Sequence, residues 1–185
     1  MKVGILAVQG AFIEHEHMFR ELGCRVAELR SASDIVGLDA LVLPGGESTV
    51  QGKLVRELGM FDSLKKLIEQ GIPVLATCAG TILLAKKICN DDKVHFQTLP
   101  VTVRRNAYGR QLGSFRTVSD FGKIKNVPMT FIRAPVIMEA ESGVEILSAV
   151  DGKIVAVEYK NQIGLSFHPE LDRDTRIIEY FIKKC

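Results

Sequence analysis

Short apolar runs alternate with segments of helical length through the first half of the chain, and this alternation limits the fold more than any other feature. The apolar runs, each short enough for a buried strand, are 2–8, 25–29, 40–43 and 73–77. The segments between and after them that have the length or spacing of helices are 12–22, 48–58, 62–70 and 79–87. Repeated strand, helix and strand units form a parallel sheet, and their crossovers place helices on both of its faces.

The second half of the chain has short strand-like runs without long helices between them. These runs are 101–105, 113–118, 130–132, 144–150, 153–159 and 162–167. Asp151 and Gly152 separate two of the runs and favour a two-residue hairpin, so an antiparallel extension is expected. The predicted fold is an α/β three-layer sandwich with a mostly parallel central sheet, helices on both faces and an antiparallel extension in the C-terminal half. Because no repeat or linker divides the chain, residues 1–185 are expected to form a single domain.

The composition excludes several classes of protein. Hydrophobic residues make up 46% of the chain and charged residues 25%, which is ordinary for a soluble globular protein. The 24 basic and 22 acidic side chains are interspersed, so no basic surface indicates binding to nucleic acid or to a membrane. The N-terminal apolar run ends before Glu14 and is too short for a signal peptide or a membrane span. We therefore expect a cytoplasmic protein that binds neither nucleic acid nor a membrane.

The cysteines and histidines give no sign of a metal or cofactor site. The four cysteines contain no CxxC pair, which argues against a zinc site and a disulfide framework: Cys24, Cys78, Cys89 and Cys185. His15 and His17 lie two residues apart on a predicted helix and therefore point about 200° apart around its axis. We expect free thiols, no metal and no cofactor, with His15 and His17 at the surface or at an interface.

Cys78 lies in the segment VLATCAG (74–80), between a predicted strand and a predicted helix. The small residues Ala76 and Gly80 flank it two positions away on either side, as a tight strand-to-helix elbow requires. At such an elbow the sulfur lies beside a helix N-terminus, whose partial positive charge favours the thiolate. Cys78 is therefore the predicted nucleophile, and the other three cysteines, which lack this context, are interpreted as structural.

A cysteine nucleophile needs a base from elsewhere in the chain, and the segment FHPE (167–170) supplies a histidine at the end of a predicted strand. Pro169 is expected to hold His168 in an extended backbone, so that the side chains of His168 and Glu170 project to the same side. The Glu170 carboxylate would then orient the imidazole and stabilise its positive charge. The sequence predicts a catalytic triad of Cys78, His168 and Glu170.

Two further segments are candidates for substrate contact. PGGEST (44–49) is a glycine turn after a strand, where a backbone N–H could face a developing oxyanion, with the Ala79 N–H as a second donor. A phosphate-binding loop is excluded, because the turn does not match GxxxxGK followed by Ser or Thr. Arg104, Arg105 and Arg110 cluster in a loop-like stretch and fit either a solvated basic face or the recognition of a carboxylate.

With PGGEST (44–49), TCAG (77–80) and FHPE (167–170) in this order, the chain resembles the class I glutamine amidotransferases, which are triad glutaminases on an α/β sheet. Three more segments are similar to the glutaminase subunits of the two-protein pyridoxal 5'-phosphate synthases: LAVQGA (6–11), RNAYGRQ (105–111) and FIRAP (131–135). The triad motifs occur in many glutaminases, whereas these three segments together are specific to that group. The resemblance covers essentially the whole chain.

The resemblance implies roles for individual residues. Cys78 would be the nucleophile, His168 the base and acid, and Glu170 the residue that orients His168. The oxyanion donors would be the backbone N–H groups of Gly46 and Ala79. The residues that would contact substrate are Gly46, Glu47, Ser48, Arg105, Ile132 and Arg133.

The resemblance also implies the reaction and the partner. The chain would hydrolyse L-glutamine to L-glutamate and ammonia through a cysteine thioester. It would deliver the ammonia to a barrel-shaped synthase subunit, in a hetero-oligomer that makes pyridoxal 5'-phosphate (vitamin B6). Ala76 and Arg104 depart from the pattern, because the family more often has glycine at the first position and an acidic residue at the second.

Three alternative functions remain open at this point. The chain could be the glutaminase subunit of a different amidotransferase. It could be a cysteine hydrolase or peptidase on a similar fold, although such enzymes usually place histidine directly after the elbow cysteine, where this chain has Ala79. It could also be a catalytically silent binding module, against which the intact set of Cys78, His168 and Glu170 argues.

Overall fold

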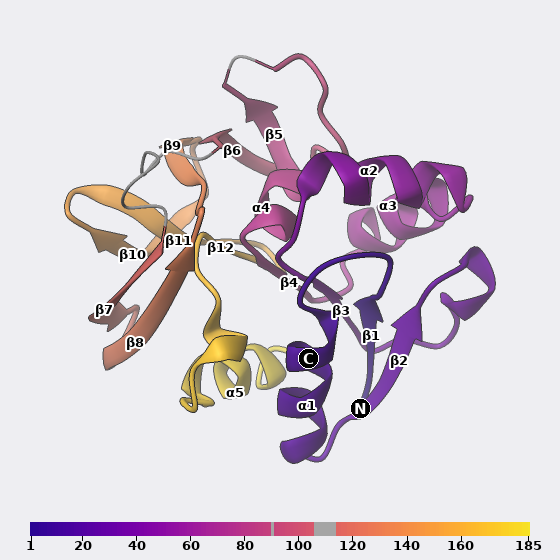
Figure 1. The fold of residues 1–185 in the computed structure, drawn as a ribbon, viewed down its shortest axis with the longest axis horizontal. Helices are drawn as coiled ribbons and strands as arrows, with labels where there is room; N and C mark the ends of the chain where they lie inside the picture. Colours follow the sequence, from indigo (N-terminus) through magenta and orange to yellow (C-terminus); the bar gives the residue numbers. More distant parts are fainter. Residues whose placement is uncertain (90, 106–113) are drawn as a thin grey trace.

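A curled sheet of mixed strand direction forms the middle of the molecule (Figure 1). The computed structural model describes residues 1–89, 91–105 and 114–185. The parallel part of the sheet contains, in spatial order, β2 (Arg25–Leu29), β1 (Lys2–Leu6), β3 (Ala40–Leu43), β4 (Val74–Thr77) and β12 (Gln162–Leu165). The antiparallel part continues from β12 through β11 (Lys153–Tyr159), β9 (Val136–Ala140), β6 (Leu99–Arg104) and β5 (Ala85–Ile88), with β10 (Glu145–Val150) paired to β11. Within the antiparallel part, β5 and β6 run parallel to each other.

Helices cover both faces of the parallel part (Figure 1). On one face lie α1 (Phe12–Glu21) and α5 (Arg176–Ile182), and on the other lie α2 (Ser48–Glu57), α3 (Phe61–Glu69) and α4 (Ala79–Leu84). Successive residues of β4 point to opposite faces. Leu75 packs in one core cluster with Phe19 of α1 and Phe181 of α5, whereas Val74 and Ala76 pack in the other core cluster, beneath α2, α3 and α4. Since both faces are buried, the parallel strands are nearly continuous apolar runs in the sequence.

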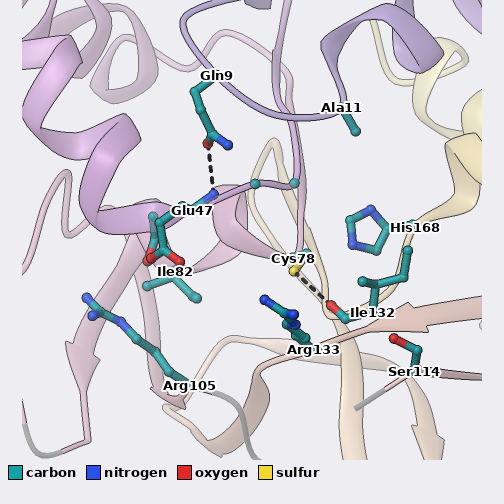
Figure 2. A pocket seen from close by; sticks show the side chains of 13 residues that line it. Gln9, Ala11, Glu47, Cys78, Ile82, Arg105, Ser114, Ile132, Arg133 and His168 are labelled. Atoms are coloured by element: carbon teal, nitrogen blue, oxygen red, sulfur yellow. Dashed lines mark hydrogen bonds between the residues drawn. The ribbon is translucent and has the colours of Figure 1, made fainter.

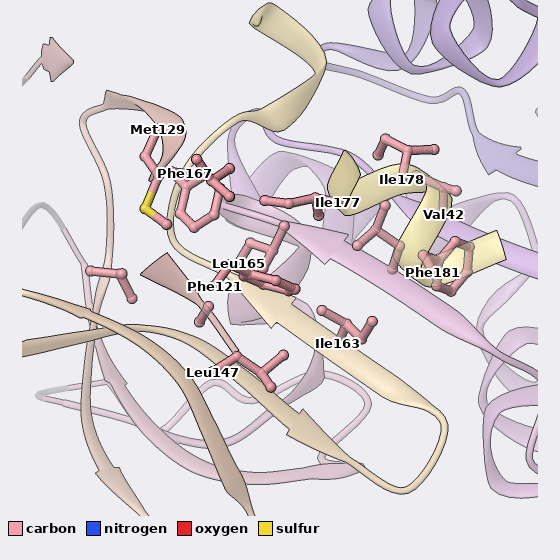
Figure 3. Close-up of a cluster of buried hydrophobic side chains, with 14 of the residues drawn as sticks. Val42, Phe121, Met129, Leu147, Ile163, Leu165, Phe167, Ile177, Ile178 and Phe181 are labelled. Atoms are coloured by element: carbon pink, nitrogen blue, oxygen red, sulfur yellow. The ribbon is translucent and has the colours of Figure 1, made fainter. Parts of the chain in front are cut away.

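A separate antiparallel pair, β7 (Ser114–Phe121) and β8 (Ile124–Ile132), is attached to the sheet through the first of these core clusters. Figure 3 shows part of that cluster, in which Phe121 of β7 and Met129 of β8 pack with Leu165 of β12 and Ile177 of α5. Aromatic burial of this kind contributes to the stability of a core and also fixes geometry. It brings the end of β8, at Ile132, toward the end of β12.

The predicted fold class is confirmed, and most predicted elements agree with the structure within two residues. The strands predicted at 25–29 and 40–43 coincide with β2 and β3. The hairpin between β10 and β11 turns at Asp151 and Gly152, whose φ angles of 49° and 71° are those of the predicted two-residue turn. Among the described residues, no helix combines the length and the apolar character that crossing a membrane requires.

Several details of the predicted secondary structure are wrong. The helix predicted at 79–87 ends at Leu84, because Ala85 is extended (φ −55°, ψ 138°) and begins β5. In β5 the side chains of Ala85 and Ile88 are buried and the two lysines between them are exposed, so this apolar run divides between a helix and an edge strand. Strand β9 was not predicted at all, and β8 is much longer than the predicted run 130–132.

Candidate active site

A pocket of about 550 Å³ lies where several strands of the parallel part end (Figure 2). In open parallel sheets the carboxyl ends of the strands form the usual crevice for a ligand. The residues that line the pocket are Gln9, Ala11, Gly45, Gly46, Glu47, Ser48, Cys78, Ile82, Arg105, Ser114, Ile132, Arg133 and His168. Those between 9 and 78 follow β1, β3 and β4, and His168 follows β12. The pocket therefore brings together the predicted nucleophile, the predicted base and every predicted substrate contact.

Cys78 is the residue at which β4 turns into α4. Its backbone has φ 47° and ψ −102°, a conformation that is strained for a residue with a side chain and that is typical of a nucleophile elbow. Gly80 is required at this turn, because a Cβ there would lie 2.0 Å from the carbonyl oxygen of Leu43. The Cys78 Sγ lies 3.8 Å from the carbonyl oxygen of Ile132 and faces the pocket (Figure 2). The elbow thus presents the side chain of Cys78 to the pocket, although the residue as a whole is only 6% exposed.

His168 and Glu170 are in direct contact, with 2.6 Å between the histidine Nδ1 and the carboxylate Oε1. The backbone that produces this contact differs from the predicted one, because Glu170 lies in a short 3₁₀ helix, η2 (Pro169–Leu171), and not in an extended segment. Pro169 occupies the first position of that helix, where a missing N–H costs nothing. His168 itself is close to extended, and its N–H donates to the carbonyl oxygen of Thr130 at 2.8 Å.

The electrostatics of the pair favour a charged imidazole. Burial acts to lower the pKa of His168, but the interactions with Cys78 and with Glu170 outweigh it and raise the pKa to about 10. For Glu170, burial acts to raise the pKa, but the neighbouring His15 and His168 outweigh it, and the pKa is lowered. The arrangement can therefore hold an imidazolium between a cysteine sulfur and a carboxylate, as a cysteine nucleophile requires.

The glycine turn after β3 packs directly against the imidazole. A Cβ on Gly45 would lie 2.2 Å from the Cε1 of His168, so only glycine leaves room for the ring. The Gly45 N–H donates to the Thr77 hydroxyl at 2.9 Å, and the Glu47 N–H donates to the Gln9 side-chain oxygen at 2.8 Å. Gly46, Glu47 and Ser48 thus form one wall of the pocket. Of the two predicted oxyanion donors, Gly46 lines the pocket, whereas Ala79 is the buried first residue of α4 next to Cys78.

The opposite wall comes from β8 and β6. Ile132 ends β8, and Arg133 follows it with a φ of 45°, which turns the chain sharply at the pocket. Arg105 follows β6, and its guanidinium Nη2 lies 3.0 Å from the Asp91 carboxylate. Arg104, its neighbour, is exposed on the end of β6. Arg110, the third member of the predicted arginine cluster, lies outside the described residues.

Five pocket residues outside the triad were not predicted individually to contact substrate: Gln9, Ala11, Gly45, Ile82 and Ser114. Gln9 carries the clearest signal that could have been used, because it follows the first predicted strand and the ends of parallel strands meet at one edge. Ser114 begins β7 and carries no comparable signal.

The expectation that His15 lies at the surface or an interface is wrong. His15 is completely buried on the inner side of α1, with its Nε2 3.4 Å from the Glu170 Oε2, whereas His17 is exposed as expected.

All four cysteines are free thiols. In the ranges 1–89, 91–105 and 114–185, no group of three or more His, Cys, Asp or Glu side chains is arranged to hold a metal ion.

Comparisons with known proteins find similar proteins over nearly the whole chain. The SNO glutamine amidotransferase family matches residues 5–185. A pyridoxal 5'-phosphate synthase subunit PdxT from Desulfitobacterium hafniense is 61% identical over 183 residues, which cover 98% of this chain and 92% of that one. A protein of the same name from Haemophilus influenzae is 50% identical over 189 residues, covering 100% and 98% of the two chains. A crystal structure of a glutamine amidotransferase, 40% identical, matches with a TM-score of 0.94 over 98% of this chain and 97% of that one.

Proposed function

Because this chain belongs to the SNO glutamine amidotransferase family, we propose that Cys78, His168 and Glu170 are the residues with which it hydrolyses L-glutamine. The family and the full-length relatives support the activity as a whole: the chain is the glutaminase subunit of a pyridoxal 5'-phosphate synthase and supplies ammonia to a partner synthase. The single observation that carries the assignment of residues is the convergence of the Cys78 elbow and the buried His168–Glu170 pair on one pocket.

The first half of the reaction forms a thioester. The Cys78 thiolate attacks the side-chain amide carbon of glutamine, a carbon–sulfur bond forms, and the carbonyl oxygen becomes an oxyanion. The backbone N–H groups of Gly46 and Ala79 stabilise this oxyanion. The His168 imidazolium then gives its proton to the amide nitrogen, the carbon–nitrogen bond breaks, and ammonia leaves. The raised pKa of His168, to about 10, is consistent with an imidazole that holds this proton before the reaction.

The second half hydrolyses the thioester. Neutral His168 takes a proton from a water molecule, and the resulting hydroxide attacks the thioester carbon. The carbon–sulfur bond breaks, which restores the Cys78 thiolate and leaves the His168 imidazolium in place. The new γ-carboxyl group releases its remaining proton to solvent, and L-glutamate leaves. Glu170 keeps the imidazole in one orientation through both halves and stabilises its charged form, since its Oε1 is 2.6 Å from the Nδ1.

The remaining lining residues would hold the substrate. Arg105 and Arg133 are the cations of the pocket wall, and arginine is well suited to a carboxylate because its guanidinium donates two parallel hydrogen bonds. We assign them to the α-carboxylate end of glutamine. The glycine turn at Gly46, Glu47 and Ser48 and the backbone of Ile132 would enclose the side-chain amide.

We further propose that the chain is a single domain that works in the cytoplasm within a hetero-oligomer with a barrel-shaped synthase subunit, without binding nucleic acid or a membrane. Two observations support the partner. Free ammonia is protonated in neutral water, so a synthase that uses it benefits from direct delivery. The two PdxT relatives are named as subunits of a synthase, and this chain matches them almost from end to end.

The test is the release of glutamate from glutamine by the purified chain in the presence of its synthase partner. Cys78→Ala should lower kcat on the order of 10⁴-fold or more, because the covalent route is lost. Cys89→Ala is the matched control, since Cys89 is a free thiol outside the pocket, and it should keep the wild-type rate. Substantial turnover by Cys78→Ala would overturn the assignment of the nucleophile.

A further inference from the structure

A buried histidine that the mechanism above does not use lies behind the triad. His15 projects from α1 and is completely shielded from solvent. Its Nε2 lies 3.4 Å from the Glu170 Oε2 and 3.1 Å from the Thr77 Oγ1. It therefore touches the oxygen of Glu170 that does not face His168, and the last residue of β4 immediately before Cys78.

The contacts of the neighbouring groups fix which nitrogen of His15 carries the proton. The Glu170 Oε1 is paired with His168, so Oε2 is the oxygen that still requires a donor. An imidazole lone pair facing a carboxylate oxygen would be repulsive, whereas an N–H in the same place is attractive. Nε2 of His15 is thus protonated and points between the Glu170 Oε2 and the Thr77 Oγ1, and Nδ1 is the unprotonated nitrogen.

The same contacts connect four separate segments of the fold. The Thr77 hydroxyl accepts the N–H of Gly45, the glycine against which the His168 ring packs. His15 therefore links α1 to the end of β4, to the turn after β3 and to η2. Each of these segments contributes to the position of the nucleophile, the base or the residue that orients the base.

We propose that His15 is a positioning residue of the triad: its Nε2–H holds the outer oxygen of the Glu170 carboxylate, so that the inner oxygen stays aligned with the His168 Nδ1. This inference rests on the proposed function for its effect on turnover. His15 acts through the N–H of its imidazole. Burial lowers the pKa of its imidazole and outweighs the opposing effect of the Glu170 charge, which agrees with a neutral ring.

The test compares two amides at position 15. In His15→Gln the amide nitrogen can reach the place of the histidine Nε2, whereas in His15→Asn the side chain is one methylene shorter and its amide lies near the place of Nδ1. Both variants replace the imidazole ring with a small neutral amide in the same buried site. A difference between them therefore reports the position of the amide N–H and not the loss of the ring. His17→Gln, an exposed change on the same helix, is the control for the helix itself.

Two readouts are measured on the full chain with its synthase partner. In the glutaminase assay, His15→Asn should lower kcat about 10²-fold, the cost of a misplaced catalytic group, with KM for glutamine unchanged. His15→Gln should recover most of that loss, and His17→Gln should match the wild type. In the second readout, iodoacetamide is added and alkylation of Cys78 is followed by peptide mass. Alkylation should be slower in His15→Asn than in His15→Gln, because the thiolate depends on an aligned imidazolium.

The two readouts separate the inference from the proposed function. If the wild type hydrolyses no glutamine, the proposed function fails, and the alkylation rates still decide whether His15 positions the pair. Equal alkylation rates and equal kcat values for the Gln and Asn variants would overturn the inference. A rise in KM without a fall in kcat would also overturn it, since that result would place His15 in substrate binding.

Discussion

The parallel part of the sheet and the strands beyond it contribute different things to the pocket. Cys78 follows β4, and His168 and Glu170 follow β12, so the groups proposed for the chemistry all stand at the ends of parallel strands. Ile132, Arg133 and Arg105 come from the ends of β8 and β6, and they form the wall where the substrate would lie. The difference predicts that changes to the triad and to the glycine that packs on its base act on kcat, whereas changes to the arginines of the other side act on KM.

Burial explains why the chemistry lies on the parallel side. Every residue of β3, β4 and β12 is buried, whereas buried residues alternate with less buried ones along β6, and half-buried residues alternate with exposed ones along most of β7. A strand packed on both faces has few ways to move, so it can hold a strained residue such as Cys78 at a fixed place. Strands with one open face tolerate adjustment, which suits a wall that must close around a substrate.

The largest effect is expected when the base is removed on the parallel side. His168→Asn should lower kcat on the order of 10⁴-fold, because neither the leaving ammonia nor the attacking water then has a proton partner. The measurement is glutamate release at saturating glutamine, with His17→Asn as an exposed control. A tenfold fall in kcat corresponds to about 1.4 kcal/mol in activation free energy. If His168→Asn lowered kcat by less than that, His168 could not be the catalytic base.

A smaller loss is expected when the turn that packs on the base is altered. In Gly45→Ala the new methyl would lie 2.2 Å from the His168 ring, so the imidazole must move, and kcat should fall about 10²-fold. Gly4→Ala is the matched control within β1, because its methyl would meet only the ends of two flexible side chains, Leu38 at 2.6 Å and Leu29 at 3.0 Å, and would not meet the pocket. Equal activity of the two variants would show that the turn does not determine the position of the base.

On the other side of the pocket, the comparison predicts an effect on binding. Arg105→Ala should raise KM for glutamine about 10-fold and leave kcat nearly unchanged, because a substrate carboxylate loses one cationic partner. Arg104→Ala is the adjacent control, with a side chain that is exposed and outside the pocket lining. A large fall in kcat for Arg105→Ala would break the division between the two sides.

The smallest effect concerns stability and pH. His95 lies in the segment between β5 and β6, with its Nδ1 3.2 Å from the Arg56 guanidinium. The pKa of His95 is lowered to about 4, mainly by burial and also by the positive charges of Arg56 and Arg105. Between this value and its ordinary pKa of 6.5 the unfolded chain binds more protons, so the free energy of unfolding falls as pH falls through that range. In His95→Gln the drop in Tm between pH 7 and pH 5 should be smaller by about 3 °C, corresponding to roughly 1 kcal/mol. An unchanged drop would show that His95 does not titrate in this window.

The sequence was a good guide to the parallel side because burial leaves a direct record there. Strands such as β3, which are covered on both faces, are uninterrupted apolar runs that end at glycine or proline. The elbow at Cys78 needs small neighbouring residues, and these are visible in the sequence. The contact between His168 and Glu170 was also predicted, although from an extended backbone. Proline at the first position of η2 fits a helical turn as well as an extended segment, so the spacing alone could not decide between them.

The features that were missed depend on tertiary contacts. The segment LLAKKI (83–88) is apolar with two lysines and fits a helix, and only its pairing with β6 makes its second half a strand. His15 and His17 point apart on their helix, which excludes a shared metal site but does not show which of the two is buried. The burial of His15 follows from the packing of α1 against η2 and β4, which brings together residues more than 60 positions apart. The polar partners of His15 leave no local pattern, although Met18 and Phe19, three and four positions later, mark its face of α1 as the buried one.

The most direct test of the account is the identity of the residue that a glutamine-like electrophile modifies. The chain, with its synthase partner, would be treated with a chloroketone analogue of glutamine, and the adduct would be located by peptide mass spectrometry. The account predicts a single adduct on Cys78, formed more slowly when glutamine is present and strongly slowed in His168→Asn. Modification of Cys24, Cys89 or Cys185 at the same rate as Cys78, or no protection by glutamine, would contradict it.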